Sequence, residues 1–117
     1  MINIDFQTEV INKSFHKAVL VNFWAPWCGP CQMLTATLEE LQAIQKDHWT
    51  LVKVNTEVEE ALAGQYHIMS IPSVKIFYKG KVIAELMGAY PRNVIERWLK
   101  AFLPTLQSEL KVENLEE

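Results

Sequence analysis

The sequence predicts one α/β domain, with a mixed central β-sheet and helices on both faces of the sheet. Three observations support this prediction. The chain has 117 residues, which is long enough for one sizeable core and too short for two. Apolar runs of the kind that form buried strands alternate with segments of helical periodicity. Two strand-like segments then flank a Lys-Gly-Lys turn, which indicates a closing hairpin. The expected order of elements is β-α-β-α-β-α-β-β-α.

The N-terminal part contains two short elements followed by a long strand. Asn3–Phe6 is a candidate strand, and Glu9–Ser14 is a weak helical turn. Ala18–Ala25 is nearly all apolar and rich in β-branched and aromatic residues, which is typical of a central strand buried on both faces. Pro26–Pro30 ends this strand.

A helix is expected directly after this break. Pro30 stands at its start, where the missing N–H costs nothing and the fixed φ suits a first helical turn. Apolar residues then recur at the spacing of one helical face, namely Leu34, Leu38, Leu41 and Ile44.

The remaining elements alternate between strand and helix before the hairpin closes the sheet. We expect a strand over Leu51–Asn55, a helix over Glu57–Tyr66, and strands over Val74–Tyr78 and Val82–Met87. The last expected element is a helix over Arg92–Leu103 that buries Val94, Trp98, Leu99 and Phe102. Pro104 ends this last helix. The sequence therefore predicts a domain over residues 1–104 and a C-terminal tail over residues 105–117.

Charge distinguishes the tail from the body of the chain. The whole chain has 11 Lys and Arg against 14 Asp and Glu, a net charge of −3. Residues 109–117 hold four acids and one base, which also gives −3, so the body balances ten against ten. A neutral body has no basic stripe for phosphate groups, which argues against nucleic-acid binding. The acidic tail is expected to be solvated rather than to bind a partner.

The hydrophobic pattern argues against a membrane protein. The longest uninterrupted apolar run is Ala18–Val21, whereas a membrane-spanning helix needs about 20 such residues. The first residues contain no basic region followed by an apolar stretch, so no secretory signal is visible. These features predict a cytoplasmic protein.

The chain has two cysteines, Cys28 and Cys31. A bond between them closes too short a loop to staple a fold, so a disulfide scaffold is excluded. A zinc half-site, a redox pair and chance remain as explanations. A structural zinc site needs four ligands, and His16, His48 and His67 lack the paired spacing of a second ligand arm. We therefore expect no metal.

Helix geometry favours the redox pair among these explanations. A cysteine reacts as its thiolate, which needs a group that stabilises negative charge. Cys28 falls at the start of the expected helix, where free N–H groups and the positive end of the helix dipole lie. Cys31 follows one turn later on the same face. Both the dithiol and the disulfide should therefore be accessible.

The residues around the cysteines resemble the active-site segment of the thioredoxin family. The string over Phe23–Met33 is Phe-Trp-Ala-Pro-Trp-Cys-Gly-Pro-Cys-Gln-Met. Ser70–Ser73 resembles the cis-proline loop of the family, Gly88-Ala89 its glycine loop, and Lys53 the lysine on its third strand. The resemblance extends over residues 2–103 and implies the thioredoxin fold.

The resemblance implies a thiol–disulfide oxidoreductase that reduces protein disulfides. Cys28 is the expected nucleophile, and Cys31 is the expected resolving residue. Gly29 and Pro30 are typical of the reducing branch, because the oxidising and isomerising branches usually carry a His beside the second cysteine. The cycle needs no bound cofactor beyond the Cys28–Cys31 disulfide. A thioredoxin reductase would recharge the pair, and the chain would act as a monomer.

The resemblance also implies substrate-binding and supporting residues. The Ile71–Pro72 bond is expected to be cis, although most X-Pro bonds are trans. The Ile71 backbone could then pair with an extended substrate segment. Trp27 is expected to be exposed beside Cys28, and Trp24 to belong to the core. The expected substrate-binding residues are Trp27, Ile71, Pro72, Gly88 and Ala89. The expected supporting residues are Asn22, Trp27, Gly29, Pro30 and Lys53.

Two residues depart from the family pattern. Asn22 stands where the family usually has a buried Asp that takes a proton from the second cysteine, and an amide cannot act as that base. Lys53 thereby loses its expected acidic neighbour. Ala36 stands where the family usually has a proline that kinks the helix, so we expect a straighter helix.

Two other classes of function remain open at this point. Asn22 favours an interaction module that uses the thioredoxin fold without redox turnover, whereas the two cysteines around Gly-Pro favour an electron carrier more strongly. An oxidase or isomerase of an exported compartment is opposed by the lack of a His beside Cys31 and by the lack of a visible signal.

Overall fold

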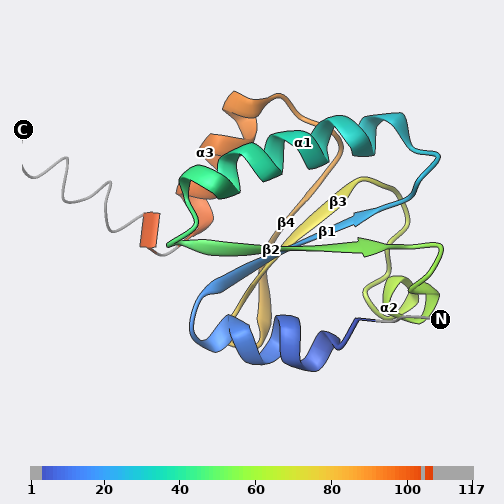
Figure 1. Ribbon diagram of the computed structural model, residues 1–117, viewed down its shortest axis with the longest axis horizontal. Coiled ribbons are helices and arrows are strands. Elements are labelled where there is room, and N and C mark those ends of the chain that lie inside the picture. The colour runs from blue at the N-terminus through green and yellow to red at the C-terminus, as the bar shows by residue number, and fades with distance from the viewer. Residues whose placement is uncertain (1–3, 104, 107–117) are drawn as a thin grey trace, which may run out of the picture.

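The computed structural model describes residues 4–103 and 105–106. A four-stranded mixed sheet with the order β2-β1-β3-β4 forms its centre (Figure 1). β1 (Ala18–Trp24) pairs in parallel with β2 (Trp49–Asn55) and antiparallel with β3 (Ser73–Tyr78). β3 also pairs antiparallel with β4 (Lys81–Met87). β1 is therefore a central strand, as its apolar composition predicts.

Helices cover both faces of this sheet (Figure 1). α1 (Gly29–Ile44) and α3 (Arg92–Phe102) lie on one face. The short α2 (Glu60–Gln65) and the π-helix η1 (Gln7–Asn12) lie on the other, and the 3₁₀ helix η2 (Lys13–Phe15) leads from η1 to β1. Within the described residues, no helix combines the length and the apolar character that crossing a membrane requires.

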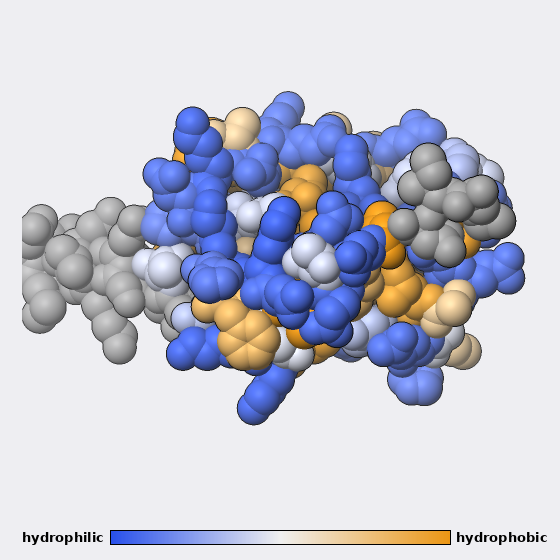
Figure 2. Space-filling view, turned by 60° about the horizontal axis from the view of Figure 1, so that its bottom comes forward, coloured by the Kyte–Doolittle hydropathy of each residue, from blue (hydrophilic) through white to orange (hydrophobic). Residues whose placement is uncertain are grey.

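Each face of the sheet has its own apolar core, because successive residues of a strand point to opposite faces. Leu20 of β1 belongs to the core beneath α1 and α3, whereas Val19 and Val21 belong to the opposite core. On the side of η1, most of the surface is hydrophilic and the apolar residues form separate patches (Figure 2). The apolar side chains of β1 are thus enclosed between the two helical layers.

The predicted α/β class and the mixed sheet with helices on both faces are confirmed, but the first predicted strand is wrong where it is described. Residues 4–6 take no part in the sheet, and Asn3 lies outside the described residues. Asp5 instead starts a helical segment, because its Oδ1 accepts the Thr8 N–H at 3.1 Å. The Phe6 ring packs against Tyr66 and Phe77, each at 5.5 Å between ring centroids. These ring contacts anchor residues 4–6 to the body of the protein, although no strand pairs with them.

The other predicted elements are present with shifted ends. α1 begins at Gly29, β2 begins at Trp49, and α2 begins at Glu60 rather than Glu57. In α3 the buried residues are Ile95, Trp98 and Leu99, whereas the predicted core residues Val94 and Phe102 are half-buried and exposed.

The core beneath α1 and α3 extends past the last helix. Leu103 and Leu106 are both buried in it. The Thr105 hydroxyl lies 2.8 Å from Nδ1 of His48. Leu106 thus packs on the body, although it follows the boundary expected at residue 104. Leu110 and the other residues of the acidic segment 107–117 lie outside the described residues.

Candidate active site

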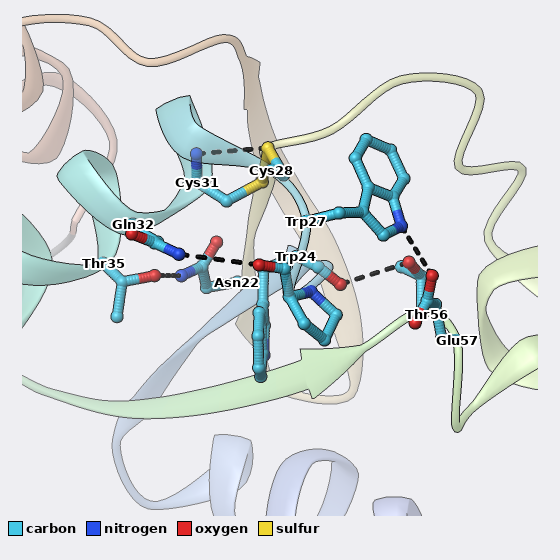
Figure 3. Close-up of a disulfide and its surroundings, with 10 residues drawn as sticks. Asn22, Trp24, Trp27, Cys28, Cys31, Gln32, Thr35, Thr56 and Glu57 are labelled. Carbon is cyan, nitrogen blue, oxygen red and sulfur yellow. Dashed lines mark hydrogen bonds between the residues drawn. A yellow bond between two sulfur atoms is a disulfide. The ribbon is translucent and has the colours of Figure 1, made fainter.

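The two cysteines lie at the N-terminus of α1, at the end of the turn that follows β1. Cys28 is the N-cap residue of the helix, with an extended backbone (φ −94°, ψ 103°), and is joined to Cys31 by a disulfide (Figure 3). The Cys28 sulfur accepts the backbone N–H of Cys31 at 3.2 Å. Cys28 is 5% exposed and Cys31 is fully buried. The helix N-terminus therefore stabilises negative charge on the sulfur that is closer to solvent.

Gly29 and Pro30 form the first turn between the cysteines. Pro30 has no N–H to donate and suits this position. A Cβ added to Gly29 would meet no atom within 4 Å, so steric crowding does not require a glycine there. Gly29 and Pro30 form the turn across which the backbone N–H of Cys31 donates to the Cys28 sulfur.

The indole of Trp27 lies beside the pair and is 70% exposed, which confirms its expected exposure. Its Nε1–H donates to Oε2 of Glu57 at 2.5 Å (Figure 3). Glu57 follows β2, and its own N–H donates to Oδ1 of Asn55 at 2.9 Å. Glu57 was missed by sequence reasoning. The signal that could have identified it is its position after a strand that runs parallel to β1.

The loop before β3 lies against the disulfide. Ile71 packs on the cluster formed by Ala25, Cys28 and Cys31. The Ile71–Pro72 peptide bond is cis, which confirms the expectation from the family resemblance.

Gly88 follows β4 and is hydrogen-bonded to this loop. Its N–H donates to the carbonyl oxygen of Pro72 at 2.9 Å. Its φ of +112° lies in the region that favours glycine, and an added Cβ would come within 3.3 Å of the Tyr90 ring. The structure therefore brings Pro72 and Gly88 together, and Ala89 follows as an exposed residue.

Apolar side chains are unusually exposed around the disulfide. Met69 is 91% exposed and Met87 53%. A shallow cavity of about 200 Å³ separates Trp27 from this loop; its lining is Trp27, Thr56, Ala63, Ile68, Met69, Ser70 and Ile71. A surface of this kind can contact the apolar side chains of another protein.

Asn22 lies fully buried on β1, beneath α1. Its Nδ2 donates to the hydroxyl oxygen of Thr35 at 2.9 Å (Figure 3). Its Oδ1 is buried and has no hydrogen-bond partner among the described residues. Thr35 is the second partner that sequence reasoning missed. Its position one helical turn after Cys31 could have indicated that it faces the same side of α1.

Lys53 lies opposite Asn22 and so lacks the acidic neighbour that the family usually provides, as expected, but it finds a different carboxylate. Lys53 is the residue of β2 opposite Asn22, but its Nζ bonds Oε2 of Glu39 at 2.7 Å. Both side chains are about half exposed, at 45% and 51%. Lys53 is long enough to reach the solvent-facing side of α1, where Glu39 supplies the carboxylate. The ion pair therefore lies at the surface instead of in the core.

The Lys53–Glu39 pair borders a cavity of about 240 Å³ on the outer side of α1. Its other lining residues are Trp24, Gln32, Thr35 and Ala36. Trp24 is half-buried, and its Nε1 has no hydrogen-bond partner among the described residues. Ala36 is exposed and lies within the continuous helix α1.

Metal ligands are not gathered at this site. Within residues 4–103 and 105–106, no group of three or more His, Cys, Asp or Glu side chains is placed to hold a metal ion. The chemistry that this arrangement supports is sulfur exchange by a cysteine at a helix N-terminus, with a second, buried cysteine in bonding contact.

Comparison with known proteins supports the same chemistry. The thioredoxin family model matches residues 2–101. The chain is 43% identical over 111 residues to a thioredoxin of Griffithsia pacifica, covering 95% of this chain and 94% of that protein. It is 40% identical over 98 residues to thioredoxin 1 of Synechococcus elongatus, covering 84% and 90%. It is 39% identical over 98 residues to the chloroplastic M-type thioredoxin of Chlamydomonas reinhardtii, covering 84% and 69%.

The family match and the geometry of the cysteine pair agree. The redox group is the disulfide itself, and this family uses no bound cofactor. Family membership implies partners of two general kinds, namely proteins with disulfides and a reductase. The chain belongs to the thioredoxin family and is a thiol–disulfide oxidoreductase that reduces protein disulfides.

Proposed function

We propose that Cys28 is the attacking nucleophile and Cys31 the resolving cysteine. The observation that carries this proposal is that Cys28 caps α1 and its sulfur accepts the Cys31 N–H, while Cys31 is fully buried. The Cys28 thiolate attacks one sulfur of the substrate disulfide, and the other substrate sulfur leaves as a thiolate. The Cys31 thiolate then attacks the Cys28 sulfur. This step releases the second substrate thiolate and forms the Cys28–Cys31 disulfide.

We propose that substrates bind along the cis-proline loop. Ile71 packs on the cluster that contains both cysteines, and in this proposal its backbone pairs with an extended substrate segment as an added strand. Trp27 contacts apolar substrate side chains on one side of the disulfide, and Gly88 with Ala89 does so on the other. The bond from Gly88 to the Pro72 carbonyl supports this arrangement, because it ties the two loops together.

Asn22, Gly29, Pro30 and Lys53 act as supporting residues in this proposal. Gly29 and Pro30 shape the turn that presents the Cys31 N–H to Cys28. Lys53 and Glu39 border the outer side of α1, where their opposite charges offset each other. The catalytic unit is the domain over residues 1–104, and the C-terminal tail over residues 105–117 takes no part in the chemistry. Leu106 contributes to stability alone.

We further propose that the protein is a cytoplasmic, monomeric electron carrier that a thioredoxin reductase recharges. The cytoplasm suits a pair that reduces protein disulfides, because protein thiols are kept reduced there. A monomer suffices because one chain supplies both cysteines, Trp27 and the cis-proline loop. Fractionation of cells, and light scattering of the purified protein, test these two points.

Trapping of partner proteins tests the roles of the cysteines. Cys31→Ser should accumulate mixed disulfides through Cys28, because the second step cannot occur. These adducts should be released by a dithiol reductant. Cys28→Ser is the matched control and should trap on the order of tenfold fewer proteins. An interaction module without redox turnover predicts equal capture by both variants, and that result would overturn the proposal.

A further inference from the structure

In the buried carboxamide of Asn22, the amide nitrogen has a hydrogen-bond partner and the oxygen has none among the described residues. The Nδ2 group donates to Thr35 at 2.9 Å, whereas Oδ1 has no partner among the described residues. Asn22 is fully buried, so water does not reach this oxygen from the surface. A buried acceptor without a donor costs free energy, and such groups are rare in folded proteins. The structure thus holds an acceptor for which a nearby donor is expected in another state of the protein.

Cys31 is the residue placed to supply that donor. Cys31 and Thr35 are four residues apart on α1, so their side chains are neighbours on one helix face. Asn22 bonds Thr35, and its carboxamide therefore lies beneath the same face. Figure 3 shows the amide nitrogen directed at Thr35 and the oxygen on the side of Cys31. In the disulfide the Cys31 sulfur carries no hydrogen, but in the dithiol it gains an S–H donor.

We propose that the Cys31 thiol donates a hydrogen bond to Oδ1 of Asn22 in the reduced protein, and that Thr35 orients the carboxamide for this bond. Reduction adds two electrons and two protons to the disulfide, and one of these protons forms the Cys31 S–H. The electrons come from a dithiol reductant. Asn22 is thus a positioning residue for Cys31, not a catalytic residue.

This hydrogen bond has two consequences for the redox pair. It exists in the dithiol state alone, so it favours reduction of the disulfide and makes the pair a weaker reductant than it would be without Asn22. It also favours the Cys31 thiol over the thiolate, because it stabilises the protonated form. The proposal depends on the assigned function only for the roles of the cysteines, since the bond itself is a property of the folded chain.

The S–H stretching band of Cys31 gives the most direct test. In Cys28→Ser the single remaining thiol is Cys31, and its band can be read by infrared spectroscopy. Adding Asn22→Leu, which has a similar shape and no acceptor, should shift the band to higher frequency, as expected for a free thiol. Thr37→Val is the matched control on α1, because the Thr37 hydroxyl bonds the Met33 carbonyl away from Cys31. It should leave the band in place.

An unchanged band in Asn22→Leu would overturn the proposal. If that variant does not fold, Thr35→Val decides in its place, because it removes the group that orients the carboxamide. A shift of the band in Thr35→Val supports the bond, and no shift contradicts it. The trapping experiment with Cys31→Ser is independent of this band, so failure of the assigned cysteine roles is distinguishable from failure of the hydrogen bond.

The equilibrium between disulfide and dithiol provides a second readout in the protein with both cysteines. Equilibration with glutathione should show that Asn22→Leu lowers the equilibrium constant for reduction about tenfold, which corresponds to a potential ~30 mV more negative for a two-electron couple. Thr37→Val should leave this constant unchanged. A constant for Asn22→Leu that equals or exceeds the wild-type value would contradict the proposal.

Discussion

The two ends of the central sheet differ in where a tryptophan and a polar side chain lie. At the end where α1 begins, Trp27 and Met69 are exposed, and the amide of Asn22 is buried. At the other end, where the described chain terminates (Figure 1), Trp49 and Leu106 are buried, and the hydroxyl of Thr105 bonds His48 at the surface. Stable folds generally follow the second pattern. The reversal at the first end indicates that function, and not stability, determines which residues lie there.

The largest effect on stability is expected at the end of the sheet where Trp49 and Leu106 are buried. Leu106→Ala should lower the free energy of unfolding by about 2 kcal/mol, or about thirtyfold in the folding equilibrium, because it leaves a cavity in the core. Disulfide reduction per folded molecule should not change. Urea denaturation and a turnover assay measure the two quantities.

Ile44→Ala is the control for this comparison, since Ile44 is 69% exposed at the last residue of α1. It should change the free energy of unfolding by less than about 0.5 kcal/mol. A Leu106→Ala variant as stable as Ile44→Ala would show that residues beyond Pro104 do not contribute to the core.

At the end of the sheet where α1 begins, replacing Asn22 with Asp should raise the rate of disulfide exchange and lower the stability of the fold. Asn22→Asp should raise the rate of disulfide turnover several-fold near pH 7, because a carboxylate can take the proton of Cys31 and an amide cannot. It should also destabilise the fold, because it buries a charge while Lys53 is already paired with Glu39. Asn12→Asp adds the same charge at an exposed position and should do neither. Equal turnover rates for Asn22→Asp and wild type from pH 6 to 9 would show that a carboxylate at this position does not take the Cys31 proton.

A smaller effect is expected at the exposed indole. Glu57→Gln keeps an acceptor for the Trp27 N–H but removes its charge, so the bond becomes weaker. We expect the KM for a protein disulfide to rise about twofold while kcat stays the same. Glu60→Gln removes the same charge from the first turn of α2 and should leave KM unchanged. A fall in kcat for Glu57→Gln would place this pair in the chemical step instead.

The smallest effect concerns Tyr66, in the core on the α2 side. Partial burial raises the pKa of the Tyr66 phenol above its usual value of 10.0. The native state therefore keeps a proton that the unfolded chain releases, so stability is complete below pH 10.0 and decreases as the pH rises through the native pKa. Tyr66→Phe should reduce this alkaline loss in urea midpoints measured between pH 9 and 11. An identical alkaline loss in both proteins would contradict the assignment to Tyr66.

Most of the fold could be predicted because its signals are local. The apolar run of β1, the periodicity of α1 and the hairpin turn each lie within one short segment. The position of Cys28 at the helix start followed from Pro30 and the change of pattern at Cys31. The first strand was predicted wrongly because its segment depends on distant partners. Phe6 packs on Tyr66 and Phe77, and a local pattern contains no information on that contact.

The partners of the site residues were harder to predict for the same reason. Glu39 and Lys53 are on different elements, and their pairing depends on how α1 crosses β2. Glu57 reaches Trp27 across the ends of two strands. Thr35 was the easiest of these partners to predict, since its spacing from Cys31 places both residues on one helix face.

The rates at which the two thiols of the reduced protein react with iodoacetamide test the central claim most directly. Mass mapping near neutral pH should show Cys28 modified first, on the order of tenfold faster than Cys31, because Cys28 caps α1 and Cys31 is fully buried. Urea-unfolded protein is the reference, in which the two cysteines should react at similar rates. Equal rates in the folded protein, or faster modification of Cys31, would contradict the account of Cys28 as the nucleophile.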